Sequence, residues 1–206
     1  HEFLDVGDVL QVGHADLAVE AEQLATGVLE DLEGLGELAH RLDGCVARAG
    51  RTPRMRLHVE IRGEGPDLVL LHGWALHGGV WGPWLDELEQ QARLHVIDLP
   101  GHGRSDWPAG ILDLAGLARA VSPHVPADAA WLGWSLGGLV ALELARQHPG
   151  RARALVLVAT TPKFLAGPDW EHGLQPEILD TFTQGLAGDY RATVQHFLAL
   201  HTRGDE

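Results

Sequence analysis

Cysteine is nearly absent from this sequence of 206 residues, which holds a single one, Cys45. One cysteine cannot form a disulfide within the chain, so the sequence indicates a reducing compartment. Long hydrophobic runs are also missing, and none reaches the length that a membrane-spanning helix needs. The two absences argue against a disulfide-framed domain and against an integral membrane protein.

Basic residues are scarce as well. The chain carries 29 acidic residues against 15 basic ones, with a formal net charge of -14. Nucleic acids and anionic membrane surfaces bind basic proteins, so this balance argues against both as partners. The first thirty residues carry acids and lack a compact apolar stretch, so they do not resemble a secretory signal. We therefore expect a cytoplasmic protein.

Residues 1–54 differ in character from the rest of the chain. Their leucine pattern hints at a coiled coil, but Gly27, Gly34 and Gly36 interrupt it, and each costs about 1 kcal/mol in a helix. The only methionine, Met55, follows directly. We interpret residues 1–54 as an extension that is not part of the native domain. The alternative is a genuine N-terminal helical module.

From Met55 onward, short apolar runs alternate with helical patterns. The expected strands cover residues 57–61, 67–71, 94–100, the run ending at 134, and 154–160. The expected helices cover residues 84–92, 112–121 and 136–148. This alternation predicts an α/β fold with a parallel central sheet and functional residues at the carboxyl ends of its strands. We assign residues 55–160 to this core and residues 161–206 to a helical segment.

One serine lies in a distinctive setting. The stretch Gly133-Trp134-Ser135-Leu136-Gly137 fits G-x-S-x-G, in which the serine occupies a sharp turn between a strand and a helix. Side chains two residues before and after such a serine would collide, which explains the glycines. A short apolar run precedes Ser135 and a helical pattern follows it, as this turn requires. We predict that Ser135 is a nucleophile; the alternative is a serine in an ordinary glycine-rich turn.

Acyl transfer also needs donors aimed at the negative oxygen of the reaction intermediate. The first expected donor is the backbone N–H of Leu136, directly after the nucleophile. The second belongs to the loop after the preceding strand, "LLHGWALHGGVW", where the N–H of Trp74 is the natural candidate. We expect the side chain of His72 to hold this loop by hydrogen bonding rather than to take part in catalysis.

A second loop, "DLPGHGRSD", follows the strand that ends near residue 98. Asp98 could be the acid of a catalytic triad, but it precedes Ser135, whereas an α/β-hydrolase places the acid after the serine. We expect Asp98 to accept hydrogen bonds from loop N–H groups. Ser105 lacks the glycine pattern of a nucleophile.

Five stretches together resemble one known family: "LVLLHGW", "LHVIDLPGHGRS", "WLGWSLGGLVAL", "ALVLVAT" and "FLALHTRG". From Met55 to Glu206 the chain is similar to the pimeloyl-acyl-carrier-protein methyl ester esterases of biotin biosynthesis. The last stretch is the most discriminating, because the others fit many α/β-hydrolases. The resemblance implies an α/β-hydrolase fold with flanking helices, a helical lid, and no cofactor or metal.

The resemblance also implies the roles of individual residues. It makes Ser135 the catalytic nucleophile and places Trp74 and Leu136 at the carbonyl of the substrate. Five consecutive lid residues would line the acyl channel: Phe197, Leu198, Ala199, Leu200 and His201. The residues alone leave another interpretation open, because Val194, Phe197, Leu198 and His201 share one helical face that could simply pack as core.

The partners of Ser135 are not evident in the sequence. The resembling family carries its triad aspartate and histidine later in the chain, so we expect both beyond residue 206 and regard the chain as a fragment that lacks its C-terminal part. Each local substitute lies in the lid or behind the sheet, which excludes the following residues: His148, Asp169, Asp180, Asp189, His196 and His201.

Together with its serine motif, the resemblance implies a carboxylesterase that cleaves the methyl ester of pimeloyl-acyl-carrier protein through a serine-bound acyl intermediate. The expected partner is the acyl carrier protein, and the expected full-length protein is a monomer. Two alternatives remain open at this stage. One is another serine α/β-hydrolase, such as a short-chain carboxylesterase or a C–C bond hydrolase. The other is an inactive fragment that lacks the triad acid and histidine.

Overall fold

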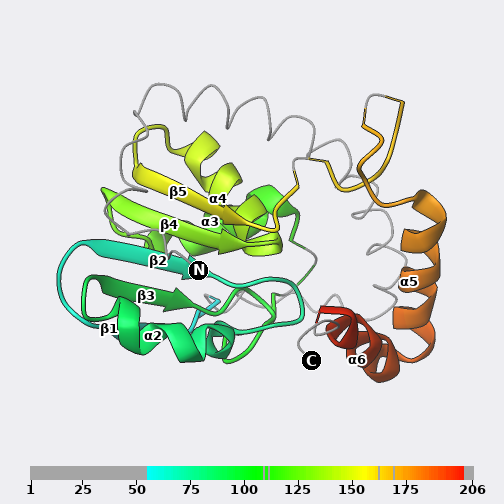
Figure 1. The fold of residues 1–206 in the computed structure, drawn as a ribbon, viewed down its shortest axis with the longest axis horizontal. Coiled ribbons are helices and arrows are strands. Elements are labelled where there is room, and N and C mark those ends of the chain that lie inside the picture. The colour runs from blue at the N-terminus through cyan, green and yellow to red at the C-terminus, as the bar shows by residue number, and fades with distance from the viewer. Residues whose placement is uncertain (1–54, 109, 111, 162, 169, 202–206) are drawn as a thin grey trace, which may run out of the picture. The chain divides into compact units, whose positions relative to one another are not determined.

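A computed structural model describes residues 55–201 apart from 109, 111, 162 and 169. For Pro83, Leu200 and His201 it describes the backbone alone. The expected extension over residues 1–54 lies outside the described residues. The chain divides into two compact units, of which the second begins at Lys163 (Figure 1). The described residues before Lys163 are called the core unit, and those from Lys163 onward are called the second unit.

A five-stranded sheet forms the centre of the core unit, with the strand order β1-β3-β2-β4-β5. The strands are β1 Val59–Arg62, β2 Asp67–Leu71, β3 Arg93–Ile97, β4 Ala129–Trp134 and β5 Ala152–Val158. Strands β2, β3, β4 and β5 pair in parallel, which confirms the predicted α/β fold.

Strand β1 departs from the predicted parallel arrangement, because it pairs antiparallel with β3. A short turn reverses the chain between β1 and β2, and its Gly63 and Gly65 have φ values of 71° and 117°. Glycine adopts such values without a steric penalty. Since β3 runs parallel to β2, a strand that enters β2 through this reversal must run antiparallel to β3.

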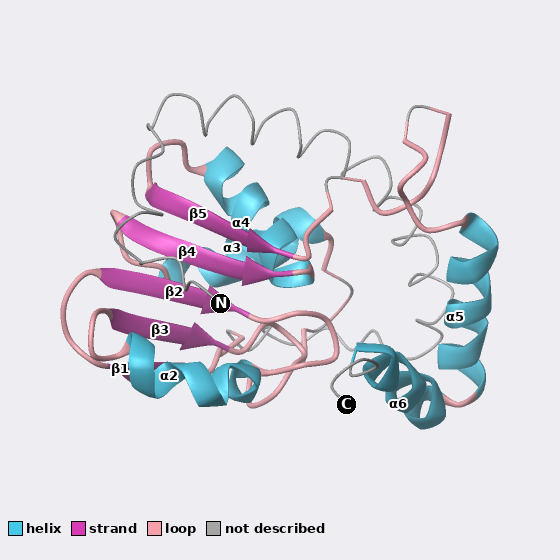
Figure 2. Ribbon diagram, viewed as in Figure 1, coloured by secondary structure: helices cyan, strands magenta, loops and turns pink. Residues whose placement is uncertain are grey.

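Helices cover both faces of the sheet (Figure 2). They are η2 Gly78–Trp81, α2 Gly82–Leu88, α3 Leu114–Val121, η3 Ser122–His124 and α4 Leu136–Gln147. Along β2, Val69 and Leu71 pack toward α3 and α4, whereas Leu68 and Leu70 pack toward η2 and α2. Neighbouring residues of a strand point to opposite faces, so a continuous apolar strand serves two hydrophobic layers.

A buried carboxylate stabilises the end of α4 nearest to α3. Glu143 is fully buried and accepts two hydrogen bonds from Arg146, at 2.7 and 2.8 Å, and one from Gln147 at 2.7 Å. Gln147 also donates to the carbonyl of Ala115 in α3, at 3.3 Å. Although burial raises the pKa of Glu143, its hydrogen bonds and the Arg146 charge hold it below the ordinary range. The group links α4 to α3 and so fixes the helix that follows Ser135.

The second unit contains α5 Pro176–Gly188 and α6 Tyr190–His201. The rings of Phe182 in α5 and Phe197 in α6 pack together with their centroids 5.7 Å apart. Before α5, single bridges join Leu165 to Leu174 and Gly167 to Trp170. Among the described residues, no helix combines the length and the apolar composition required to cross a membrane.

The first turn of α4 lies directly against the end of β2. A Cβ atom added to Gly137 would collide with the carbonyl oxygen of Leu71 and would lie 2.7 Å from that of His72. Both neighbours are backbone atoms and cannot rotate away. Glycine at position 137 therefore permits the close contact between helix and sheet on which the turn at Ser135 depends.

Replacing this glycine should destabilise the fold. We expect Gly137→Ala to lower the free energy of unfolding by about 1–3 kcal/mol, the usual cost of overpacking a tight site. Gly82→Ala is the matched control, because nothing lies within 4 Å of an added Cβ there. The urea concentration at the unfolding midpoint should be lower for Gly137→Ala than for the unmodified protein, and it should be unchanged for Gly82→Ala. Equal midpoints in the two variants would contradict the contact.

Candidate active site

Ser135 lies between the last residue of β4 and the first residue of α4. Its φ and ψ are 52° and -114°, a left-handed backbone conformation that is unusual for a residue with a side chain. Its N–H donates to the carbonyl of Val158 in β5 at 2.8 Å. Its half-buried side chain makes no capping hydrogen bond to α4. The predicted strand, turn and helix are thus present, with a hydroxyl that does not cap the helix.

Glycines surround this turn because the backbone segments approach closely. A Cβ at Gly133 would lie 2.5 Å from both the carbonyl oxygen of Gly137 and the Cα of Gly138. A Cβ at Gly138 would collide with the Thr160 hydroxyl, which donates to the carbonyls of Val158 at 3.2 Å and of Ser135 at 3.4 Å. The sequence explained Gly133 and Gly137, but it did not reveal that Gly138 makes room for Thr160.

Several residues at the carboxyl ends of the parallel strands have a strained backbone. Three neighbouring parallel strands, β2, β4 and β5, are each followed by a non-glycine residue with positive φ. These residues are Ala75 at 61°, Ser135 at 52° and Ala159 at 48°. Such conformations cost about 1–3 kcal/mol each and often gather at functional sites. Their position supports the expectation that the site lies at the carboxyl ends of the strands.

The loop after β2 lies beside the serine. A Cβ atom added to Gly73 would be 3.6 Å from the Cβ of Ser135 and 3.5 Å from the carbonyl oxygen of Trp134. The next residue along, Trp74, is half-buried. On the other side, the N–H of Leu136 belongs to the first turn of α4, where no carbonyl one turn earlier can accept it. The expected donors thus belong to the two segments that flank the hydroxyl.

His72 is fully buried and makes two hydrogen bonds. Its Nε2 accepts from the N–H of Leu99 at 2.9 Å, and its Nδ1 lies 2.8 Å from the carbonyl oxygen of Gly73. The carbonyl can only accept, so Nδ1 carries the proton and the ring is neutral. Burial lowers the pKa of His72 to about 4. The hydrogen bond to the Gly73 carbonyl raises this pKa, but by less than burial lowers it. His72 therefore holds the loop, as expected.

Asp98 and Ser105 also have structural partners. The fully buried carboxylate of Asp98 accepts from the N–H groups of Gly78 at 2.7 Å and Arg104 at 2.9 Å. The Ser105 hydroxyl donates to the carbonyl of Asp98 at 2.5 Å and accepts from the N–H of His58 at 2.9 Å. The expected role of Asp98 as an acceptor for loop N–H groups is confirmed, and neither side chain is free for catalysis.

The histidines of the core unit have other neighbours than Ser135. His148, which caps the far end of α4, lies 3.0 Å from the hydroxyl of Ser122. His77 accepts from the N–H of Gly79, and His102 is bonded to the carbonyl of Pro100. Within the described residues, neither a histidine nor a carboxylate is hydrogen-bonded to the Ser135 hydroxyl, and no three metal-binding side chains gather into a site.

The expected channel residues lie at the end of α6. Phe197 and Leu198 are half-buried and Ala199 is exposed, whereas only the backbone of Leu200 and His201 is described. The contact between Phe197 and Phe182 shows that part of the apolar face packs within the second unit. A channel role for these residues stays a prediction. Asp180 and Asp189, which sequence reasoning set aside, are exposed in the same unit.

The low pKa of His72 predicts a specific loss of stability in acid. Between about pH 6.5 and about pH 4 the unfolded chain binds a proton at His72 that the folded protein excludes, so the stability falls as the pH falls. The difference in pKa corresponds to at most about 3 kcal/mol. His72→Gln keeps a donor and an acceptor but does not titrate, so its urea midpoint should fall less between neutral pH and pH of about 4.5.

His172→Gln is the control for this measurement, because its imidazole is 72% exposed. It should retain the pH dependence of the unmodified protein. If His72→Gln shows that same dependence, the proton is not excluded from His72 in the folded state.

Comparison with known proteins places this arrangement in a wider group. The chain is 48% identical over 148 residues to the pimeloyl-[acyl-carrier protein] methyl ester esterase of Xanthomonas campestris pv. campestris (strain B100), covering 72% of this chain and 58% of that protein. It is also 48% identical over 152 residues to the enzyme of that name from Yersinia enterocolitica, covering 73% and 58%. The chain thus spans less than two thirds of the length of these relatives, and the resemblance read from the sequence is confirmed over that span.

Solved structures give the same fold. An esterase from Exiguobacterium antarcticum superposes with a TM-score of 0.64 at 24% identity, over 69% of this chain and 56% of that one. A hydrolase from Pseudomonas aeruginosa PA01 superposes with a TM-score of 0.57 at 27% identity, over 73% and 58%. The family model described as the alpha/beta hydrolase fold matches residues 66–202. The chain belongs to the alpha/beta hydrolase fold family.

Proposed function

We propose that the full-length protein is a serine carboxylesterase that hydrolyses the methyl ester of pimeloyl-acyl-carrier protein in biotin biosynthesis. The observation that carries the proposal is the strained turn at Ser135, which presents a hydroxyl without a capping role beside the loop of Gly73. The names of the curated relatives support the substrate. The single cysteine of the sequence agrees with a cytoplasmic location, and we expect a monomer that needs no cofactor.

The proposed reaction has two steps. The Ser135 oxygen attacks the ester carbonyl, and the negative oxygen that results accepts hydrogen bonds from the N–H groups of Trp74 and Leu136. Collapse of this intermediate releases methanol, which carries away the serine proton by way of a general base. Water then attacks the acyl-enzyme, releases the free acid and returns the proton to Ser135.

The general base and its acid partner come, in this proposal, from outside the described residues. Each histidine of the core unit with a resolved hydrogen bond serves another group, as His72 and His148 do. The described part therefore contributes the nucleophile and the charge-stabilising segments. The apolar residues near Phe197 in α6 would accommodate the aliphatic acyl chain, which requires an apolar groove with few polar anchors.

Ser135→Ala provides the first test. In the full-length protein this variant should lose ester turnover by about 10³-fold or more, because removing the nucleophile leaves only the oxyanion donors and substrate binding. Its thermal midpoint should stay near that of the unmodified protein, since the lost oxygen makes no capping bond.

Ser122→Ala is the matched control for the nucleophile. Ser122 also lies within reach of a histidine, but at the start of η3, and its hydroxyl accepts from Arg151 at 2.8 Å. It should keep turnover within a few-fold. If Ser135→Ala retains turnover, or if Ser122→Ala loses it, then Ser135 is not the nucleophile.

The substrate can be tested separately with two kinds of ester. A pimeloyl methyl ester attached to acyl carrier protein should be a better substrate, by kcat/KM, than short p-nitrophenyl esters. Rapid hydrolysis of the short esters alone would instead favour a general short-chain carboxylesterase that uses the same Ser135.

Recognition of the carrier predicts a role for basic residues. Acyl carrier proteins are acidic, as is this chain, so a local basic patch is needed. Candidates in the second unit are Arg191, which is exposed at the start of α6, and Lys163; Arg203 lies outside the described residues. Arg191→Glu should raise the KM for the carrier-linked ester several-fold and leave a free methyl ester unchanged.

Arg93→Glu is the matched control for this charge reversal. Arg93 is an exposed arginine at the first residue of β3, so it lies at the end of the sheet away from Ser135. It should change neither KM. Equal effects of Arg191→Glu on the two substrates would mean that the carrier binds elsewhere.

A further inference from the structure

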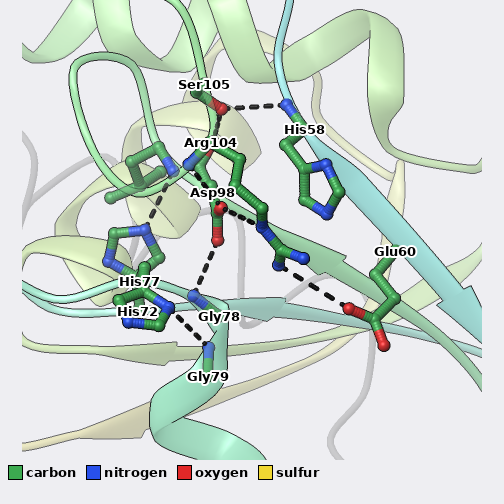
Figure 3. A network of polar contacts seen from close by, with 10 residues as sticks. His58, Glu60, His72, His77, Gly78, Gly79, Asp98, Arg104 and Ser105 are labelled. Carbon is green, nitrogen blue, oxygen red and sulfur yellow. Dashed lines mark hydrogen bonds and ion pairs between the residues drawn. The ribbon is translucent and has the colours of Figure 1, made fainter.

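The loop between β2 and η2 is held at both ends by two consecutive residues that follow β3. At its start, Nε2 of His72 accepts the N–H of Leu99 at 2.9 Å. At its end, the N–H of Gly78 donates to Oδ1 of Asp98 at 2.7 Å. Figure 3 shows these contacts on neighbouring segments at one edge of the sheet. Trp74 lies between the two attachment points, so its backbone position is fixed from both sides.

The Asp98 carboxylate is committed on both oxygens. Oδ2 accepts from the N–H of Arg104 at 2.9 Å and from its guanidinium Nε at 3.2 Å. Burial raises the pKa of Asp98, but the N–H groups of Arg104 and Gly78 and the guanidinium charge together hold it below the ordinary range. The carboxylate is therefore ionised at neutral pH, and it accepts three charge-assisted hydrogen bonds while fully buried.

The surrounding backbone is shaped around this carboxylate. A Cβ at Gly78 would lie 3.0 Å from Oδ1 and 2.7 Å from the side chain of Val96, and a Cβ at Gly103 would collide with Oδ2. Glycine at these two positions lets the N–H groups of both loops reach Asp98. The Arg104 guanidinium continues to Glu60 in β1 at 3.6 Å, which ties the group to the antiparallel strand as well.

The loop that is held contains a strained residue. Ala75 has a φ of 61°, and it lies between the attachment points at His72 and Gly78. A residue with a side chain keeps such a conformation only where its surroundings determine the backbone. The two attachments supply that constraint. A shift of about 1 Å in a group that stabilises a transition state can reduce a rate about 100-fold, so the position of this loop matters for catalysis.

We propose that Asp98 is a positioning residue for catalysis, which holds the loop through Gly78 so that the N–H of Trp74 points at the negative oxygen of the ester intermediate. The proposal rests on the proposed function, since it assigns Trp74 as a donor in ester hydrolysis. It predicts that loss of the Asp98 charge affects the transition state more than it affects substrate binding.

Asp98→Asn in the full-length protein tests this role. Asparagine has the same shape, but whichever way its amide is turned, its NH2 group would face an N–H donor, either that of Gly78 or those of Arg104. With a p-nitrophenyl ester we expect kcat to fall about 10- to 100-fold and KM to change less than about 3-fold. The affinity for an aryl trifluoromethyl ketone, whose serine adduct carries the same negative oxygen, should fall in parallel with kcat.

Asp67→Asn is the matched control. Asp67 is hydrogen-bonded to His95 at 2.6 Å. It is the first residue of β2, so it lies at the amino ends of the parallel strands, away from Ser135. This variant also loses a hydrogen-bonded carboxylate, one that is 29% exposed, so it should lose stability while kcat and the affinity for the ketone stay unchanged. If both variants lower kcat equally, or if Asp98→Asn raises KM instead, Asp98 only stabilises the fold and the proposal is wrong.

Two further measurements keep the test decisive. If Asp98→Asn does not fold, Arg104→Gln removes the guanidinium from Oδ2, together with its ion pair to Glu60, and it should lower kcat several-fold with an unchanged KM. Hydrogen exchange of peptides covering residues 72–78 should quicken in Asp98→Asn but not in Asp67→Asn, whether or not any ester is hydrolysed. Unchanged exchange would overturn the proposal. A protein that cleaves the p-nitrophenyl ester but not the carrier-linked ester would refute the proposed substrate alone.

Discussion

The close approach of α4 to the sheet is the constraint on which the rest of the site depends. The helix begins immediately after β4, and its first turn lies against the carbonyl groups at the end of β2. A side chain at Gly137 would force these segments apart, and side chains at Gly133 and Gly138 would collide with the start of α4 and with Thr160. The strained backbone of Ser135 and its closeness to the loop of Gly73 accompany this contact. Hydrophobic packing beneath the helix and the buried Glu143 hold it in place.

Much of this arrangement could be predicted from the sequence because it depends on local chemistry. The G-x-S-x-G pattern requires its turn through sterics within five residues, and the alternation of apolar runs with helical patterns predicts the α/β layers. The structural roles of His72 and Asp98 were also predictable, since each follows a buried strand and precedes glycines. The roles of Trp74 and of the residues from Phe197 onward stay predictions, because they concern a bound substrate.

Other features depend on contacts between distant segments, which periodicity does not reveal. The pairing of β1 with β3 follows from the insertion of β3 between β1 and β2, so that strands which are not consecutive lie side by side. Thr160 meets Gly138 only because β5 lies beside β4, and Arg104 reaches Asp98 only because the loop after β3 folds back. Each of these residues has an unremarkable sequence context. Their importance appears when the backbone is placed in space.

The environment of the serines has a consequence for chemical labelling. The sequence has three serines, and two of their hydroxyls are committed: Ser105 between a carbonyl and an N–H, and Ser122 between His148 and Arg151. The hydroxyl of Ser135 has no such attachment within the described residues. With the general base that the proposed function requires, a serine-directed electrophile would therefore react at Ser135 rather than at the other two serines. Activity-based probes could then report the state of the turn at Ser135 in a crude extract, without purification and without knowledge of the natural substrate.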